Sequence, residues 1–243
     1  MASWIVHLRV AEGLLDRIDG LDPEYFAVGN VAPDSGIPDE NWENFEPPPE
    51  ILHFKGQEDA PWKLADLDFY RQHIQTTKTE ETDTRRASFV WGYFFHLLVD
   101  NLWDDQIDQP TREHFSAEFE ADPKFIWEVK RDWYGLDFAH VRGNPDSIFW
   151  STFLNCDYTQ NYLPFLPPGN VQERIAYIKE FYQRTDQKLE DVYGVRPDKY
   201  LSEGEMDDFI ALATEKLHKI YEYLCGDDPK LNSFASALEL AYE

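Results

Sequence analysis

Cysteine, basic residues and long apolar runs are scarce in this sequence, and each shortage excludes a class of protein. Two cysteines among 243 residues, Cys156 and Cys225, cannot form a disulfide framework, so we expect a reducing compartment. No apolar run approaches the roughly 20 residues of a membrane-spanning helix. The N-terminal stretch MASWIVHLRVAEGLL lacks the basic start and long apolar core of a signal peptide. These absences predict a soluble, cytoplasmic protein with no integral membrane segment.

Positive charge is scarce because 22 Lys and Arg residues stand against 47 Asp and Glu residues, for a net charge of -25. Such a surface repels nucleic-acid backbones at long range, so we expect no long nucleic acid as partner. A small phosphorylated substrate stays compatible with this charge, because a bound metal ion reverses the local field. The motifs GxGxxG, GxxxxGK[ST] and GxSxG and an adjacent HD dyad are missing, which argues against dinucleotide-binding, P-loop, α/β-hydrolase and HD-phosphohydrolase functions.

Aromatic residues, in contrast, make up 16% of the chain, enough for a sizeable core. Apolar residues recur at helical spacing and convincing two-residue alternation is missing, so the sequence predicts an all-α fold in a single multi-helix domain. Residues 30–61 are rich in Pro, Asp, Asn and Gly and predict a long irregular stretch that is packed down by its own aromatic residues. Helices are predicted over Ile5–Ile18, Pro23–Gly29, Leu64–Thr77, Thr82–Trp103, Thr111–Glu120, Pro123–Phe138, Asp146–Tyr162, Val171–Val192, Ser202–Leu224 and Asp228–Tyr242.

The stretch GYFFHLLVDNLW is almost wholly apolar, yet it carries His96 and Asp100 four residues apart, on one face of a helix. One interpretation is a buried pair whose members satisfy each other. Three further residues lie in apolar or turn-fixed contexts: His7 in SWIVH, Asp34 in GNVAPDSG and His53 in ILHF. Mixed imidazole and carboxylate ligands suit zinc and similar divalent ions, and a shared carboxylate commonly holds a dinuclear centre. The second interpretation is therefore a metal site built from all five residues.

With these residues in view, the sequence resembles the zinc-dependent phospholipase C family, which is related to the S1/P1 nucleases. The resemblance covers roughly residues 3–105 and is strongest to the non-secreted bacterial branch, through SWIVHLRVAEGLLDRI and GNVAPDSGIPDE. It implies an all-α fold of the phospholipase C/P1 nuclease type, with a metal-ligand half over about 1–105 and a C-terminal helical half over about 106–243. The family's motif residues occur here in the family's order: Trp4, His7, Asp34, His53 in LHF, and His96 and Asp100 in HLLVD.

The resemblance implies a metal-dependent hydrolase of phosphoric esters that binds two zinc ions and a small phosphorylated substrate. A metal-bound hydroxide would attack phosphorus, Asp100 would bridge the ions, and Asp34 would serve as ligand and as catalytic base. The loop Ser35–Glu50, with Trp42 and Phe45, would form a wall of the pocket. Two alternatives stay open: a metal-binding helical protein without turnover, and a nuclease-like or nucleotidase-like phosphoesterase.

The chain departs from the family pattern at three places. In the secreted enzymes the tryptophan is the mature N-terminal residue and its amine binds zinc, but Trp4 is preceded by three residues and is not counted as a ligand. Where the family places another histidine after the HxxxD aspartate, this chain has Gln106. His114 and Glu118 could complete a third metal position or form an ordinary surface pair.

Overall fold

The computed structural model describes residues 1–243 except 42, 57, 59, 77–82, 123, 195–198, 227, 228, 232 and 243. The chain is mostly helical, as predicted. The α-helices are α1 (Trp4–Leu15), α2 (Pro23–Gly29), α3 (Pro49–Leu52), α4 (Asp66–Tyr70), α5 (Thr84–Trp103), α6 (Gln109–His114), α7 (Ser116–Ala121), α8 (Ile126–Gly143), α9 (Ile148–Ser151), α10 (Asn170–Gln183), α11 (Gln187–Tyr193) and α12 (Glu203–Cys225).

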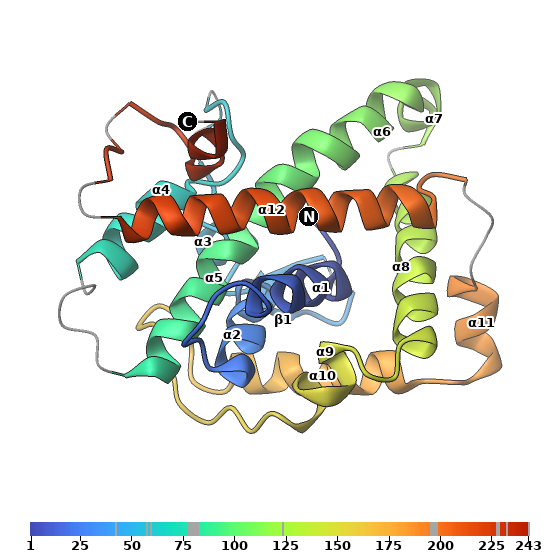
Figure 1. Ribbon diagram of the computed structural model, residues 1–243. Helices are drawn as coiled ribbons and strands as arrows, with labels where there is room; N and C mark the ends of the chain where they lie inside the picture. Colours follow the sequence, from blue (N-terminus) through green and yellow to red (C-terminus); the bar gives the residue numbers. More distant parts are fainter. Residues whose placement is uncertain are drawn as a thin grey trace.

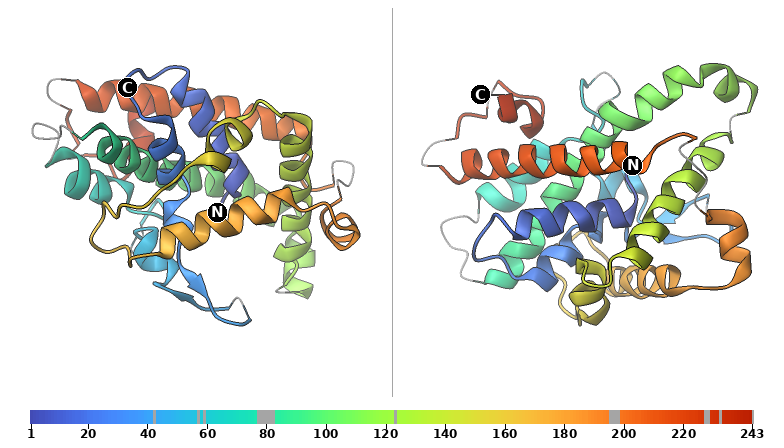
Figure 2. Two further views of the ribbon diagram at one scale, coloured as in Figure 1. Left: turned by 90° about the horizontal axis from the view of Figure 1, so that it is seen from below. Right: turned by 45° about the vertical axis from the view of Figure 1, so that its right-hand side comes forward.

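Shorter elements connect the helices. The 3-10 segments are η1 (Ala32–Asp34), η4 (Phe153–Asn155) and η5 (Ala237–Tyr242), and the π-helical turns are η2 (Arg71–Gln75) and η3 (Asp104–Asp108). Strands β1 (Ile37–Pro38) and β2 (Phe45–Glu46) pair antiparallel, with Ile37 opposite Glu46, and lie at one edge of the molecule (Figure 2).

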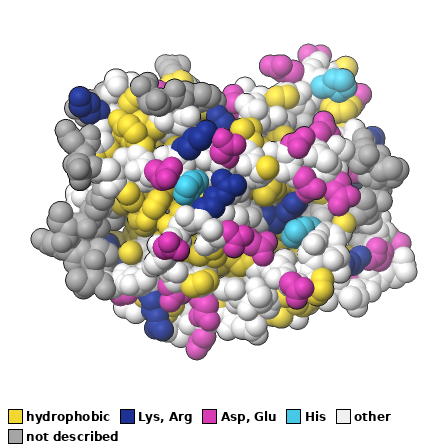
Figure 3. All heavy atoms as spheres, in the orientation of Figure 1, with side chains coloured by type: hydrophobic (Ala, Val, Ile, Leu, Met, Phe, Trp, Pro, Cys, Tyr) yellow, Lys and Arg dark blue, Asp and Glu magenta, His cyan; other side chains and the backbone are white. Residues whose placement is uncertain are grey.

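Helix α5 is the central element, because every residue from Ser88 to Trp103 on it is buried. Helix α2 packs along it, and α1 packs against α12 while also contacting α2 and α5. The long helix α12 crosses the front of the molecule, and α8 and α10 lie at the side and below (Figure 1). Acidic side chains are spread over this face (Figure 3). One cluster of buried apolar side chains runs from Ala2 to Leu240 and includes residues of both predicted halves. Within the described chain, we find no helix with the length and apolar character that crossing a membrane requires.

Two glycines allow α2 and α5 to approach backbone to backbone. A Cβ atom on Gly92 would lie 2.4 Å from the carbonyl oxygen of Phe26, and one on Gly29 would lie 2.2 Å from that of Phe89. No side chain fits at either position, so the close crossing depends on glycine. The crossing also brings Asn30 close to His96, because Asn30 follows Gly29 and His96 lies one turn beyond Gly92.

Several predicted helix boundaries were wrong. The predicted helix Asp146–Tyr162 ends after α9 and η4, and residues 156–162 are irregular. The predicted helix Val171–Val192 is two helices, because the Asp186 side chain accepts a hydrogen bond from the backbone N–H of Leu189 and begins α11 there. Of the described part of Asp228–Tyr242, only η5 is helical. The irregular stretch 30–61 contains η1, the two strands and α3.

Candidate metal centre

Helix α1 brings His7 into the core from an anchored N-terminus. The Ser3 hydroxyl caps the helix, accepting from the N–H of Val6, and donates to Oδ1 of Asp137 at 2.8 Å. The buried Asp137 also accepts a hydrogen bond of 2.7 Å from the hydroxyl of Tyr182 on α10. This anchor fixes the first turn of α1, and His7, one turn later, is 0% exposed.

Helix α5 supplies His96 and Asp100, one turn apart, as the four-residue spacing predicts. The Nδ1 atom of His96 lies 2.8 Å from the carbonyl oxygen of Asn30. That carbonyl is in reach because Gly29 and Gly92 let the two helices touch. Nδ1 therefore carries the proton that the carbonyl accepts, which leaves Nε2 facing Asp100.

The irregular stretch supplies the remaining two residues. Asp34 ends the 3-10 turn η1, with Pro33 inside that turn, and His53 caps the C-terminus of α3. The Nδ1 atom of His53 lies 3.2 Å from the carbonyl oxygen of Pro49. Behind His53, the Tyr93 hydroxyl donates to the carbonyl oxygen of Leu52 and ties α3 to α5.

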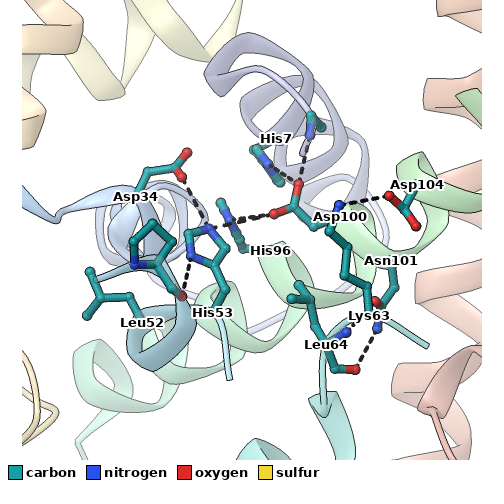
Figure 4. Close-up of polar contacts among 12 residues, drawn as sticks. His7, Asp34, Leu52, His53, Lys63, Leu64, His96, Asp100, Asn101 and Asp104 are labelled. Carbon is teal, nitrogen blue, oxygen red and sulfur yellow. Dashed lines mark hydrogen bonds and ion pairs between the residues drawn. The ribbon is translucent and has the colours of Figure 1, made fainter. Parts of the chain in front are cut away.

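The five predicted ligands form one cluster, in which three histidines face the carboxylate of Asp100 and Asp34 contacts one of them, His53 (Figure 4). Oδ1 of Asp100 lies 3.4 Å from Nε2 of His7, and Oδ2 lies 3.3 Å from Nε2 of His96 and 3.7 Å from Nε2 of His53. On the other side of His53, its Nε2 lies 3.2 Å from Oδ1 of Asp34. Five side chains from four chain segments thus form one connected cluster.

The five side chains divide into two overlapping groups with ligand atoms close enough for one ion each. His7, His96 and Asp100 form the first group, and Asp34, His53 and His96 form the second. His96 is common to both by distance, but one imidazole nitrogen has one lone pair and binds one ion. Asp100 has two oxygens that face different histidines, so its carboxylate is the group that could bind both ions at once.

The donor set fits a divalent metal ion. With the Nδ1 atoms of His53 and His96 beside backbone carbonyls, the neutral form of each ring would turn the lone pair of Nε2 toward carboxylate oxygens. In the described part of the chain, these two Nε2 atoms, both ring nitrogens of His7 and Oδ2 of Asp100 are buried with no hydrogen-bond partner. Buried polar atoms without partners are costly. A histidine that gives its other ring proton to a carbonyl is the usual state of a metal ligand.

Electrostatics within the cluster keep the carboxylates ionised. Burial alone would raise the pKa of Asp34 and Asp100, but the neighbouring histidines outweigh it and hold both below their ordinary range. Burial, helped by the nearby His96, lowers the pKa of His7 to about 4. For His96 the carboxylates of Asp100 and Asp34 outweigh burial and raise the pKa. At neutral pH His7 is therefore neutral and able to act as a ligand.

A cavity of about 180 Å³ opens beside Asp34 and His53. Its apolar walls include Trp4, Phe45 and Trp127. The prediction that Phe45 lines the pocket is therefore confirmed, whereas Trp42 lies outside the described residues. The polar lining includes two cations, Lys130 on α8 and Arg174 on α10.

The residues proposed for a third metal position are not part of the cluster. His114 and Glu118 are exposed and belong to different helices, because α6 ends before Phe115 and α7 begins after it. Gln106 is also exposed, in η3, and lines a separate cavity together with His114. Trp4 is a wall of the pocket, in agreement with its exclusion from the ligand set.

Sequence reasoning missed the backbone groups that contact the candidate ligands. The carbonyls of Asn30 and Pro49 belong to backbone and carry no residue signature. The backbone N–H of Ala2, which donates to Oδ1 of Asp100 at 2.8 Å, is equally invisible in a sequence. Comparison with protein-family models, curated proteins and solved structures found no match.

Proposed function

We propose that this protein is a metal-dependent hydrolase of phosphate esters, similar to zinc-dependent phospholipase C. One observation carries the proposal. The Nδ1 atoms of His53 and His96 are turned to backbone carbonyls, and their Nε2 atoms face carboxylate oxygens at 3.2–3.7 Å without a hydrogen bond. This arrangement suits a cation held between imidazoles and carboxylates. The ligand types favour zinc, and the two groups around His96 favour two ions.

Bound zinc would lower the pKa of a water molecule toward neutrality and neutralise charge on the phosphate. The side chains divide the remaining work. Asp100 presents one oxygen to His7 and the other to His96 and His53, which is the placement of a bridging ligand. Asp34 lines the cavity, and 16% of its side chain is exposed. Its carboxylate would orient the attacking water and accept its proton.

The surroundings of the cavity support a substrate with an apolar part. Of the described residues, four large apolar side chains are exposed: Met1, Ile51, Trp127 and Tyr177. Met1 and Trp127 line the cavity itself, Ile51 precedes the lining residue Leu52, and the Tyr177 ring packs edge-on against Trp4 at 5.8 Å. Two exposed apolar side chains that line the cavity, and a third that packs against its Trp4 wall, support an apolar binding surface there.

The test is hydrolysis of a generic phosphodiester and a phosphomonoester by zinc-loaded protein, compared with Asp34→Asn. We expect turnover in the wild type and a loss of about 10²–10⁴-fold in kcat in the variant, the range for a lost general base. Asp39→Asn, on an exposed side chain of the β1–β2 loop, is the matched control and should leave kcat unchanged. Equal rates in Asp34→Asn and the wild type would overturn the assigned role.

The non-catalytic alternative is a helical metal-binding protein. It is favoured by the exposed positions of Gln106, His114 and Glu118, which supply no third ligand group. Stoichiometric zinc without hydrolysis of any phosphate ester would establish it. A nuclease-like or nucleotidase-like activity is the other alternative, and comparing rates on a lipid head-group ester and a dinucleotide separates it. The cytoplasmic location stays part of the proposal.

A further inference from the structure

Two basic side chains line the same cavity as Asp34 and His53, although basic residues are scarce in the chain. Lys130 comes from α8 and Arg174 from α10. Both belong to the C-terminal half, which contributes none of the five predicted ligands. Basic residues beside a site for divalent cations oppose metal binding, so their presence needs a reason.

Arg174 is held in one orientation. Its side chain is buried, and Nη2 donates to the carbonyl oxygen of Gly36 at 2.6 Å. The guanidinium carbon lies 5.5 Å from the ring centroid of Trp4 and 5.6 Å from that of Tyr177. A guanidinium fixed by a carbonyl and two aromatic faces is pre-organised, so little side-chain entropy is lost when it binds a ligand.

Lys130 is half-buried, and its Nζ lies 5.3 Å from the ring centroid of Trp127. Within the described part of the chain, no carboxylate forms an ion pair with it. Burial lowers the pKa of Lys130, and the charges of Asp34 and Asp108 act in the opposite direction. A half-buried ammonium without a carboxylate partner is costly unless an anion reaches it.

Counting charges shows what kind of anion the cavity needs. Two divalent ions would bring four positive charges, and Asp34 and Asp100 offset two of them. Lys130 and Arg174 add two and a metal-bound hydroxide would offset one, so the centre and cavity would carry three positive charges before a substrate binds. A phosphate diester offsets one charge and a phosphate monoester offsets two. In a site of reduced dielectric constant, the monoester dianion is therefore attracted more strongly to every cation than the diester monoanion is.

We propose that Lys130 and Arg174 bind the phosphate oxygens of a phosphate monoester dianion and make the site select monoesters over diesters. The inference rests on the proposed function, because it assumes a metal centre beside the two cations. Arg174 offers planar donors that match phosphate oxygens, and Lys130 offers a point charge. The two residues are thus specificity-determining side chains.

The first test compares kcat/KM for p-nitrophenyl phosphate and bis(p-nitrophenyl) phosphate in zinc-loaded wild type, Lys130→Gln and Arg174→Lys. We expect the wild type to prefer the monoester. Each variant should lose about 10–100-fold on the monoester, as expected for a lost charge-assisted hydrogen bond, and less on the diester. Lys199→Gln, on an exposed lysine lining the separate cavity, should change neither rate. Preference for the diester, or equal losses on both substrates, would overturn the inference.

The second test needs no turnover and keeps the two proposals apart. Inorganic phosphate at pH 8 and dimethyl phosphate serve as dianionic and monoanionic probes in calorimetric titrations of the zinc-loaded protein. We expect tighter binding of inorganic phosphate, weakened about 10–100-fold by Lys130→Gln. That result without hydrolysis would refute the proposed hydrolase but support the anion site. Hydrolysis with equal affinity for both probes would refute the anion selectivity alone, and a protein that binds no metal would overturn both.

Discussion

The imidazole rings of His7 and His96 are stacked, with centroids 3.8 Å apart and planes 8° from parallel. The two rings come from α1 and α5, and their Nε2 atoms face opposite oxygens of Asp100. Two stacked imidazolium ions would repel each other in a site that is closed to water. His7 is the neutral ring of this pair, because burial and the nearby His96 lower its pKa to about 4.

Replacing Asp100 tests its role as the shared ligand. In Asp100→Asn, the amide oxygen can still accept the hydrogen bond from Ala2, so the metal-free fold should survive. The variant lacks the charge and the second ligand oxygen, so we expect bound zinc to fall from two ions per chain to one or none. Elemental analysis of the dialysed protein measures this. Asp104→Asn, one turn further along and paired with Lys63, should keep both ions; two ions in Asp100→Asn would contradict the bridging role.

Zinc should also stabilise the fold, because a ligand that binds only the folded state adds free energy by mass action. At zinc concentrations near 100 times Kd the gain is about 2.7 kcal/mol. For a chain of this length that corresponds to a rise in Tm of about 5–10 °C. Thermal unfolding with zinc and with a chelator measures the shift, and an unchanged Tm would speak against a built metal site.

The close crossing of α2 and α5 should make Gly92 intolerant of any side chain. A Cβ atom there would lie 2.4 Å from the carbonyl oxygen of Phe26, so Gly92→Ala must push the helices apart. We expect a loss of about 1–3 kcal/mol in unfolding free energy, typical of overpacking, and weaker zinc binding because Asn30 moves away from His96. In Gly204→Ala, where a Cβ meets nothing within 4 Å, stability should be unchanged or higher. Wild-type stability and zinc affinity in Gly92→Ala would refute this view of the crossing.

The buried carboxyl of Asp137 should make stability depend on pH. Burial raises its pKa from 3.8 to about 7, above the value in the unfolded chain. The folded state therefore holds a proton that the unfolded state has released, and unfolding free energy should fall as pH rises from about 4 to about 7. The slope from one group is about 1.4 kcal/mol per pH unit.

Urea unfolding of the chelated protein at several pH values isolates this slope. The variant Asp137→Asn has no carboxyl to titrate at this position. Between about pH 4 and pH 7, its unfolding free energy should therefore fall less steeply than that of the wild type, by the slope of one group. Asp66 is also buried, and its pKa is raised to about 6, so its slope remains in both proteins and cancels in the difference. Identical slopes in wild type and variant would show that Asp137 is ionised in the fold.

The five candidate ligands could be found from the sequence because each one stands in a local context that is readable. His96 and Asp100 interrupt an apolar helix, Asp34 follows Pro33 in a turn, and His53 lies between apolar residues. The helical class was equally readable from the apolar spacing. The candidate ligands and the long α5 therefore needed no tertiary information.

The rest depended on tertiary packing. Lys130 and Arg174 look like any surface cation in the sequence, and only the placement of α8 and α10 brings them to the cavity. The carbonyl of Asn30 reaches His96 because Gly29 and Gly92 meet, which neither glycine reveals alone. The sequence predicted one helix over Val171–Val192 because its apolar residues recur at helical spacing. The chain forms two helices instead, because the Asp186 side chain caps the N-terminus of α11.

The proposed function depends most on a two-ion zinc centre around Asp100. The most direct test is anomalous scattering at the zinc edge from crystals of zinc-loaded protein, with elemental analysis of the same sample. We expect two zinc ions per chain, one beside His7 and Asp100 and the other beside Asp34 and His53. No bound zinc, or zinc only at other residues, would contradict it.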